Sequence, residues 1–379
     1  MRVLVNTLST KKHSGGAYQI AYNFIVKSQE HKEIEWVYVV SNDLDEILPE
    51  ALKKNRYYYV FPTQPDFKHS YKRVKKVLAE LEEQLKPDVV YSITAPSYFT
   101  FKAPEVMRFT NPWLTHPNKY AWSVLPLKTK IRYFLYGLNQ KRLMKKANFF
   151  ITQTETCAEG IKRITLVPKE QVKVVNNVLP AVFKSMGNTP IIENNYINIA
   201  CVGAATTHKN FDIIPDVLLE LKKNGLKDVR IHTTLPPDDG IYVVIINRLR
   251  AYGIEDMYIN HGRVSQHQLG EIYRRCQFCF LPSLLEVFSA STVEAMYYQL
   301  PIVATDFDFN REVMDDACLY YEPMNPTDAA SKLALLINNN ELQMEYKEKM
   351  KERLNLYGDY DQHFNDICEF LKEVVNKEN

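Results

Sequence analysis

Residues 278–305 read FCFLPSLLEVFSASTVEAMYYQLPIVAT, and this stretch contains a strand, a loop, a helix and a second strand. The runs FCFLP (278–282) and PIVAT (301–305) are short, apolar and rich in β-formers, as buried strands are. The helical pattern of residues 290–299 separates them. A strand, a helix and a strand in this order indicate a parallel β-α-β unit.

The same alternation runs through the rest of the chain and predicts an α/β fold with doubly wound parallel sheets. Strands are expected at 2–6, 35–41, 57–61, 88–93, 106–110, 148–152 and 172–177, and then at 196–203, 229–234, 256–260, 278–282, 301–305 and 318–322. Helices are expected at 16–28, 71–85, 127–146, 155–165, 210–224, 240–252, 266–275, 290–299, 326–339, 341–356 and 360–375.

A chain of 379 residues exceeds the usual size of a single core, so two domains are expected. The periodicity is lost at 178–195, where Pro, Gly and Asn accumulate, and this segment reads as a linker. We therefore predict a Rossmann-like domain over 1–180, a second one over 181–355, and a carboxyl-terminal helix over 356–379, for which packing against the first domain is one option. Two such domains would face a cleft, with ligands at the carboxyl ends of the strands.

Composition is ordinary for a globular protein, with 46% apolar and 24% charged residues. The sequence has no run of about 18 apolar residues, so no membrane span is predicted. The first residues have the pattern of a strand rather than of a signal peptide. The six cysteines are scattered, which fits a reducing compartment, and Cys276 and Cys279 read as part of a buried strand. The expected location is the cytoplasm.

Charge is divided unevenly along the chain. Residues 1–185 contain 29 Lys and Arg against 16 Asp and Glu, whereas 186–379 contain 18 against 29. A basic first half suggests an anionic partner, although mutual attraction of the two halves explains the division equally well. The basic, aromatic segments 68–78 and 126–147 suit a protein that lies on the anionic inner face of a membrane, and a solvated helix face is the alternative.

Two loops could bind phosphate. Gly15 and Gly16 lie between the first strand and a helix, where backbone N–H groups can face an anion, although a tight turn would need glycine as well. Lys209 lies at the start of a helix after strand 196–203, and could meet phosphate oxygens or be a solvated lysine beside an Asn cap. Neither loop is a GxGxxG or Walker motif.

Glu286 and Glu294 flank the helix start that follows strand 278–282. Glu286 could accept hydrogen bonds from sugar hydroxyls or be an ordinary loop carboxylate. Glu294 could hold a ribose diol, or complete a capping box with Ser291 as N-cap. A diphosphate on the helix N-terminus between them would favour the ligand-binding interpretation.

The segment FLPSLLEVFSASTVEAMYYQLPIVATDFDFNREVMDDACLYYEPMNP resembles the signature region of the GT-B, family 4 retaining glycosyltransferases. The resemblance rests on PS-x-x-E, on E-x7-E as Glu286 and Glu294, on EAM at 294–296, on PIV at 301–303 and on Glu312. VGAATTHKN, SGGAYQIAYN and HGRVSQHQLGEIYRRC are similar to the donor diphosphate loop, the amino-terminal glycine loop and the base-binding segment of that family.

The resemblance implies transfer of a sugar from a nucleotide diphosphate to a glycan or lipid-linked acceptor hydroxyl, in surface polysaccharide synthesis. It makes Glu286 the sugar contact and Glu294 the ribose contact, with His116 as the candidate catalytic histidine. For donor binding it implies backbone groups of Gly15 and Gly16, the Lys209 ammonium, the backbone near Val264, and the N–H groups of Phe288 and Ser289.

This sequence departs from the family pattern where Ala204 replaces an arginine and where the loop reads Glu286-Val287-Phe288-Ser289 instead of E-G-F-G. The resemblance implies no metal or other cofactor, and places the DxD of Asp306 and Asp308 in a variable loop. A GT-B nucleotide-sugar epimerase and a non-catalytic nucleotide-sugar-binding protein are the alternatives. Nucleic-acid binding is not expected, because the second half of the chain is acidic.

Overall fold

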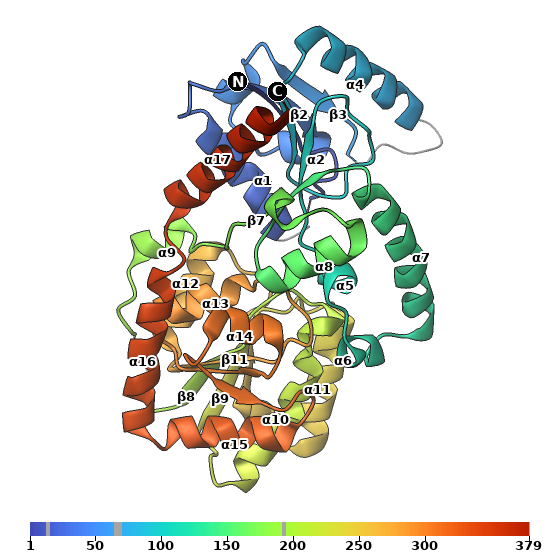
Figure 1. The fold of residues 1–379 in the computed structure, drawn as a ribbon. Coiled ribbons are helices and arrows are strands. Elements are labelled where there is room, and N and C mark those ends of the chain that lie inside the picture. The colour runs from blue at the N-terminus through green and yellow to red at the C-terminus, as the bar shows by residue number, and fades with distance from the viewer. Residues whose placement is uncertain (13–15, 64–69, 192–194, 379) are drawn as a thin grey trace. The chain divides into compact units, whose positions relative to one another are not determined.

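The computed structural model describes residues 1–12, 16–63, 70–191 and 195–378, and it contains two compact α/β units (Figure 1). The first unit comprises Met1–His116, Ile131–Asn176 and Asp361–Asn379, and the second comprises Pro117–Lys130 and Asn177–Tyr360. The predicted α/β fold class with two parallel sheets is confirmed.

The first unit is built on a seven-stranded parallel sheet of order β3-β2-β1-β4-β5-β6-β7. Its strands are β1 (Arg2–Asn6), β2 (Glu35–Ser41), β3 (Tyr58–Phe61), β4 (Val89–Ser92), β5 (Glu105–Arg108), β6 (Phe149–Thr152) and β7 (Val172–Val174). Its helices are α1 (Gly16–Ser28), α2 (Asn42–Asp45), α3 (Glu50–Lys53), α4 (Tyr71–Leu85), α5 (Pro112–Thr115), α8 (Glu155–Thr165) and α17 (Tyr360–Glu378), and α7 (Leu127–Met144) begins in the second unit and continues into the first.

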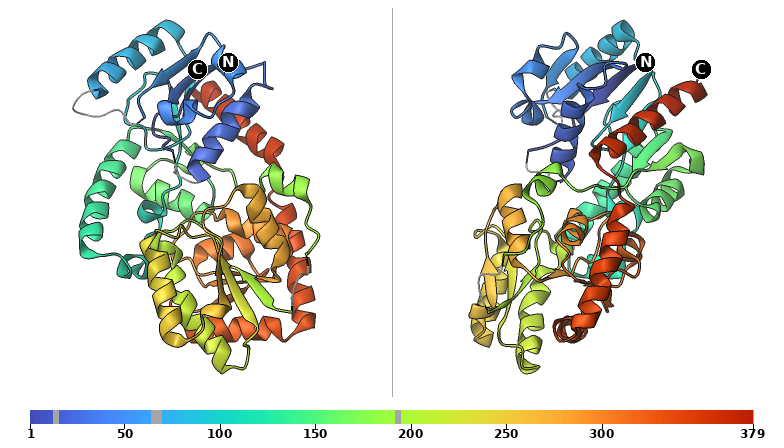
Figure 2. Two further views of the ribbon diagram at one scale, coloured as in Figure 1. Left: turned by 180° about the vertical axis from the view of Figure 1, so that it is seen from behind. Right: turned by 90° about the vertical axis from the view of Figure 1, so that its left-hand side faces the viewer.

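Both faces of this sheet are apolar, as parallel sheets require. Val3 and Val5 of β1 point to one core, and Leu4 between them points to the other, because side chains alternate along a strand. The first of these cores includes Phe364 and Phe370 of α17. The final helix of the chain therefore belongs to the core of the unit that contains the first strand (Figure 2).

The second unit has a six-stranded parallel sheet of order β10-β9-β8-β11-β12-β13. Its strands are β8 (Ile197–Ala200), β9 (Val229–Thr233), β10 (Tyr258–Asn260), β11 (Phe278–Leu281), β12 (Ile302–Thr305) and β13 (Leu319–Tyr321). Its helices are α6 (Lys119–Ser123), α9 (Ala181–Met186), α10 (Ile214–Lys223), α11 (Gly240–Tyr252), α12 (Gln266–Arg275), α13 (Ala290–Tyr297), α14 (Asp308–Met314), α15 (Pro326–Ile337) and α16 (Asn340–Asn355).

Strand order reverses between β8 and β11. From β8 the chain moves outward to β9 and β10, and from β11 it moves outward in the other direction to β12 and β13. The loops that leave these two adjacent strands therefore diverge and leave a space at the carboxyl edge of the sheet, which is where doubly wound sheets bind ligands. This topology positions the candidate site.

The predicted linker 178–195 is wrong in one respect, because it contains helix α9. Phe183 of α9 is fully buried among residues of the second unit, and its ring packs edge-on against Tyr273 at a centroid distance of 6.4 Å. A six-residue helix has too few residues to show a helical period, so its existence depends on this tertiary contact.

Packing in the first unit allows one test. Helix α8 approaches α5 so closely that a Cβ on Gly160 would overlap the backbone and side chain of Thr115. We expect Gly160→Ala to reduce the free energy of unfolding by roughly 1–3 kcal/mol, because the two helices must move apart. Urea unfolding measures the change. Gly240→Ala, where a Cβ would meet no atom within 4 Å, is the control and should change stability by less than about 1 kcal/mol.

Candidate functional site

A buried ion pair lies at the point where strand order reverses in the second unit. Lys209, from the loop after β8, contacts Glu286, from the loop after β11, with 2.6 Å between Nζ and Oε1. The two side chains are only 14% and 15% exposed. The structure thus brings together two of the residues singled out from the sequence, from loops that follow neighbouring strands.

Local backbone geometry fixes the position of Lys209. It ends a short 3-10 helix, Thr207–Lys209, and Asn210 after it adopts a left-handed conformation with φ 55°. Asparagine tolerates this conformation better than most residues. The aliphatic part of the lysine passes close to Gly203, where a Cβ would lie 3.5 Å from Cε of Lys209.

The loop that carries Glu286 is held on both sides. The Leu284 N–H donates to the His208 carbonyl at 2.7 Å, and the Leu284 carbonyl accepts from the Asn118 side chain, also at 2.7 Å. The Thr305 hydroxyl donates to the Ser283 carbonyl at 2.6 Å. Three separate segments of the second unit therefore hold the backbone that precedes Glu286 in place.

The carboxylate of Glu286 is ionised despite its burial. Burial by itself raises the pKa of this group, but the positive charge of Lys209, with a smaller effect of His208, more than offsets it, so the pKa lies below its usual value. Burial lowers the pKa of His208, and the charge of Glu286 only partly opposes this. The site therefore contains one carboxylate that can only accept hydrogen bonds and one ammonium that can only donate them.

Helix α13 begins beside this pair. Its N-cap is Ser289, whose side chain makes no capping hydrogen bond. The Ser289 hydroxyl instead accepts from Lys209 Nζ at 3.3 Å and lies 2.8 Å from the Ser291 hydroxyl. Because the Ser289 side chain does not cap the helix, it leaves the first N–H groups to other acceptors, such as an anion.

The capping box of Ser291 and Glu294, which the sequence offered as the alternative to a ribose contact, does not form. Ser291 lies within the helix rather than at its N-cap, and Glu294 accepts a hydrogen bond from the Tyr273 hydroxyl of α12 at 2.7 Å. Burial raises the pKa of Glu294 to about 7, although the Tyr273 hydroxyl and the charge of Lys209 oppose the shift. Glu294 is thus a buried carboxyl that changes protonation near neutral pH.

The other predicted residues occupy different positions. Val264 is half-buried in the loop before α12, whose start has a capping box formed by Ser265 and Gln268. The ring of Phe288 is buried and packs edge-on against Tyr357 with 5.2 Å between centroids, so only its backbone is available to a ligand.

Gly16 and His116 belong to the first unit. Gly16 is exposed at the start of α1, and a Cβ there would meet no atom within 4 Å. His116 is half-buried at the end of α5, where its Nδ1 lies 2.9 Å from the Thr115 hydroxyl. Gly15 lies outside the described residues.

Sequence reasoning missed the residues that support the ion pair. His208 and Asn118 contact the loops around Lys209 and Glu286, and Tyr273 binds Glu294. His208 adjoins a predicted residue in the sequence and could have been suspected. Asn118 and Tyr273 are distant in sequence, and no local signal identifies them.

The residues considered for metals have structural partners. Asp306 forms two hydrogen bonds with Arg311, at 2.5 and 2.8 Å, and Asp308 begins α14. Cys276 and Cys279 are buried thiols, and burial raises the pKa of each. Within the described ranges, no group of three or more His, Cys, Asp or Glu side chains is arranged to hold a metal ion.

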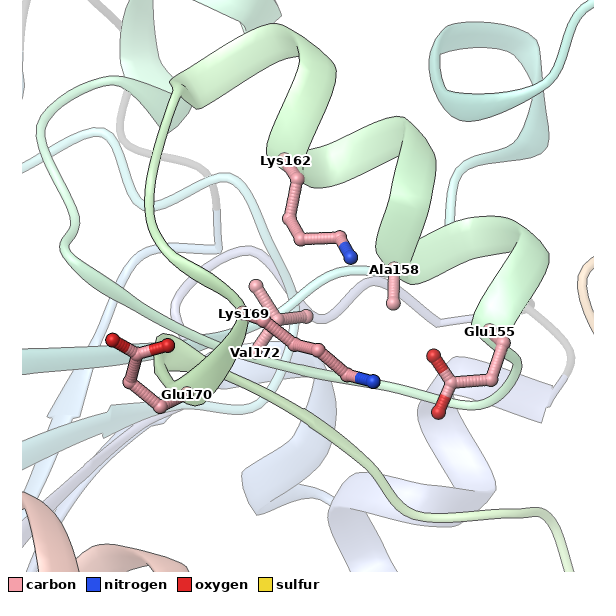
Figure 3. A pocket seen from close by; sticks show the side chains of 6 residues that line it. All are labelled: Glu155, Ala158, Lys162, Lys169, Glu170 and Val172. Atoms are coloured by element: carbon pink, nitrogen blue, oxygen red, sulfur yellow. The ribbon is translucent and has the colours of Figure 1, made fainter.

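A separate hollow of about 340 Å³ lies in the first unit between α8 and β7 (Figure 3). The side chains of Lys162, Lys169 and Glu155 extend toward a common space there, whereas Glu170 points away. Lys162 is already paired with Glu159. None of the residues singled out from the sequence lines this hollow, so it is not part of the candidate site.

Comparison with known proteins supports a glycosyltransferase domain in the second unit. Residues 188–353, less than half of the chain, match the sequence model of the family described as Glycosyl transferases group 1. An uncharacterized glycosyltransferase of Methanocaldococcus jannaschii is 31% identical over 153 residues, which span 40% of this chain and 41% of that protein.

Solved structures share the fold over nearly the whole length. A glycosyltransferase from Rickettsia africae has a TM-score of 0.72 at 12% identity, covering 99% of this chain and 98% of that one. Anabaena HepE, solved in complex with UDP and glucose, has a TM-score of 0.68 at 14% identity, covering 98% and 99%. A mutant of S. aureus TarM, in complex with fondaparinux, alpha-GlcNAc-glycerol and UDP, has a TM-score of 0.69 at 13% identity, covering 98% and 99%. The fold is therefore GT-B.

The first prediction for the site concerns the stability that the ion pair of Lys209 and Glu286 contributes. Lys209→Met leaves the buried carboxylate of Glu286 without its counter-charge and should lower the free energy of unfolding by about 3 kcal/mol or more. Adding Glu286→Gln should recover part of this loss, because the uncompensated charge is removed. Urea unfolding of both single variants and the double variant gives the coupling energy.

The pair of Lys223 and Glu220 on α10, which are 58% and 23% exposed, is the control nearer the surface, and its coupling energy should stay below about 1 kcal/mol. Strictly additive effects at Lys209 and Glu286 would show that their contact does not stabilise the protein.

The second prediction concerns the pH dependence of stability that Glu294 causes. Because its pKa is about 7 in the folded protein against an ordinary value of 4.5, the folded state binds the proton more tightly than the unfolded state. Its contribution is therefore most favourable below pH 4.5, declines as the pH rises toward 7, and is constant above that. Across this window the loss is on the order of 3 kcal/mol.

Glu294→Gln should abolish that part of the pH dependence, since the amide cannot ionise but can still accept from Tyr273. Urea unfolding at pH 5 and pH 8 checks this. Glu341→Gln, at an exposed position of α16, should leave the wild-type pH dependence intact. An equal loss between pH 5 and pH 8 in wild type and Glu294→Gln would exclude the assigned pKa.

Proposed function

We propose that the protein transfers a sugar from a nucleotide diphosphate sugar to an acceptor hydroxyl, with retention at the anomeric carbon. The observation that carries this proposal is the cluster of Lys209, Glu286 and Ser289 at the start of α13, where the strand order of the sheet reverses. The match of residues 188–353 to group 1 glycosyltransferases supports it.

In this proposal the donor diphosphate binds between Lys209 and the first N–H groups of α13. A developing negative charge on the leaving diphosphate is stabilised there by one full positive charge and by the helix N-terminus. Because Ala204 stands where the family has an arginine, Lys209 supplies this charge without that second cation.

Glu286 is proposed to receive the sugar. As an ionised carboxylate it accepts hydrogen bonds from hydroxyl groups, and its pairing with Lys209 keeps it ionised although it is buried. The same lysine would thus contact both the sugar-binding carboxylate and the diphosphate. In this proposal the bond that breaks lies near the ion pair of Lys209 and Glu286.

The remaining roles follow the family resemblance and stay proposals. Glu294 contacts the ribose diol, the backbone near Val264 contacts the base, and the N–H groups of Phe288 and Ser289 face the donor. From the first unit, backbone groups of Gly15 and Gly16 contact the donor and His116 acts in catalysis. No metal or other cofactor is proposed, and no covalent glycosyl-enzyme.

For the acceptor we propose a glycan or a lipid-linked saccharide, as in surface polysaccharide synthesis. The TarM complex contains fondaparinux and alpha-GlcNAc-glycerol together with UDP, and the HepE complex contains UDP and glucose. These ligands belong to those proteins. They support an acceptor of the saccharide class here, and no nucleic-acid partner is proposed.

The test is a panel of UDP-, GDP- and dTDP-sugars, assayed for donor hydrolysis and for transfer to saccharide acceptors. We expect one donor to be consumed, with the product retaining the anomeric configuration by proton NMR. Glu286→Gln and Lys209→Met should each reduce kcat/KM by roughly 100-fold, because each removes a charged contact to the reacting donor.

Glu220→Gln, at a surface position of α10, is the control and should keep full activity. Circular dichroism must show that each variant is folded at the assay temperature. Release of an epimerised sugar from donor alone would instead indicate an epimerase, and tight donor binding without turnover would indicate a non-catalytic binding protein.

A further inference from the structure

Helix α7 exposes an apolar face to solvent. Leu127, Ile131, Phe134, Leu135 and Leu138 are each between 52% and 73% exposed. At about 100° per residue they fall within an arc of roughly 100° on the helix surface, so they form one continuous strip. We call these five residues the outer stripe.

The outer stripe is not the face by which α7 packs on its unit. Gly137, Gln140, Leu143 and Met144 are buried, and they lie on the opposite side of the helix. The Gln140 side chain accepts a hydrogen bond from Asn111 at 2.8 Å. The helix is thus anchored by one face and carries a second apolar face that the fold does not use.

The position of α7 in the structure agrees with the exposure of the outer stripe. It stands at the margin of the first unit in Figure 1 and in the reverse view of Figure 2. Exposed apolar patches of this kind mark surfaces that bind a protein or a membrane. The charge of the residues around the outer stripe distinguishes a protein partner from a membrane.

The surroundings of the outer stripe are basic. Residues 127–146 contain seven Lys and Arg and no Asp or Glu. On a helical projection Lys128 and Lys130 lie on either side of the stripe, and Lys141, Arg142 and Lys145 continue it toward the end of the helix. A second copy that docked the same face on itself would place these cations opposite one another, which is unfavourable.

We propose that α7 docks on an anionic membrane surface, with the outer stripe entering the boundary between headgroups and acyl chains and the flanking cations contacting lipid phosphates. This inference rests on the exposure and charge of α7 and does not depend on the proposed sugar transfer. Among the described residues no helix is long and apolar enough to cross a membrane, so the contact is a surface one.

Helix α4 adds further cations in the same unit. The Tyr71 hydroxyl at the start of α4 donates to the Tyr98 carbonyl at 3.0 Å, and the Tyr98 hydroxyl lies 3.5 Å from that of Tyr136 on α7. The exposed Lys72, Arg73, Lys75 and Lys76 follow Tyr71. The contact reaches α7 at Tyr136, on the side of the helix turned away from the outer stripe, so the cations of α4 belong to the same unit but not to the surface around the stripe.

The test is flotation of the whole protein with vesicles of phosphatidylcholine alone or with 30 mol% phosphatidylglycerol, at about 50 mM salt. We expect binding only to the anionic vesicles. The variant Ile131→Ser/Phe134→Ser/Leu138→Ser should lose at least tenfold in the partition coefficient, and Lys130→Gln/Lys141→Gln/Arg142→Gln should lose roughly 100-fold.

Matched controls come from exposed or partly exposed positions elsewhere in the protein. Val243→Ser/Val244→Ser/Leu356→Ser removes three exposed apolar side chains elsewhere, and Lys332→Gln/Lys347→Gln/Lys351→Gln removes three cations. Both should bind like wild type. All substitutions are at the surface, and circular dichroism checks that the variants fold.

Insertion itself has a separate readout. Phe134→Trp should add a fluorescence component that shifts to shorter wavelength with anionic vesicles, whereas Leu356→Trp should add one that does not shift. Equal binding of the outer-stripe variant and wild type would overturn the proposal. Absence of vesicle binding, together with a dimer in light scattering that the outer-stripe variant abolishes, would identify a second copy as the partner instead.

Discussion

Parallel pairing of β8 with β11 is the constraint on which the second unit depends. In this pair Ile199 lies opposite Phe278 and Ala200 opposite Cys279, so the two strands end together at the same edge of the sheet. Every further strand adds outward from this pair in one of two directions. The chain therefore leaves β8 and β11 in opposite directions, no crossover helix lies between their carboxyl ends, and the ion pair of Lys209 and Glu286 forms across the space that remains there.

The long helices and the parallel sheets could be predicted from the sequence because their signals are local. Helices α1, α4, α8, α11 and α12 have the predicted bounds, and a capping side chain begins each of α8, α11 and α12. Short elements could not be predicted in this way. Helices α9 and α14 have six and seven residues, and buried side chains from distant segments stabilise them more than their own propensities do.

The part of the candidate site that lies directly after predicted strands could be predicted from the sequence. Glu286 and Lys209 each follow a predicted strand, so their proximity required only the correct strand order. Glu294 was harder, because two serines precede it and the sequence does not say which one begins the helix. The structure begins the helix after Ser289, which places Glu294 two residues further along the helix than a start after Ser291 would, and its carboxyl group binds the Tyr273 hydroxyl. Tyr273 lies on α12, far from Glu294 in the sequence. The contact between the two side chains results from the packing of the two helices, which no local sequence pattern indicates.

The contribution of α17 to the first core has a consequence for the order in which the chain can mature. Residues 177–360 form the second unit together with Pro117–Lys130, which is synthesised before them, so this unit needs no segment that is synthesised after it. The first unit, by contrast, must wait for Phe364, Phe370 and Leu371 before its core is complete. During translation, the half of the protein that emerges first from the ribosome is therefore the half that finishes folding last, and its sheet remains incompletely covered while the second unit is made.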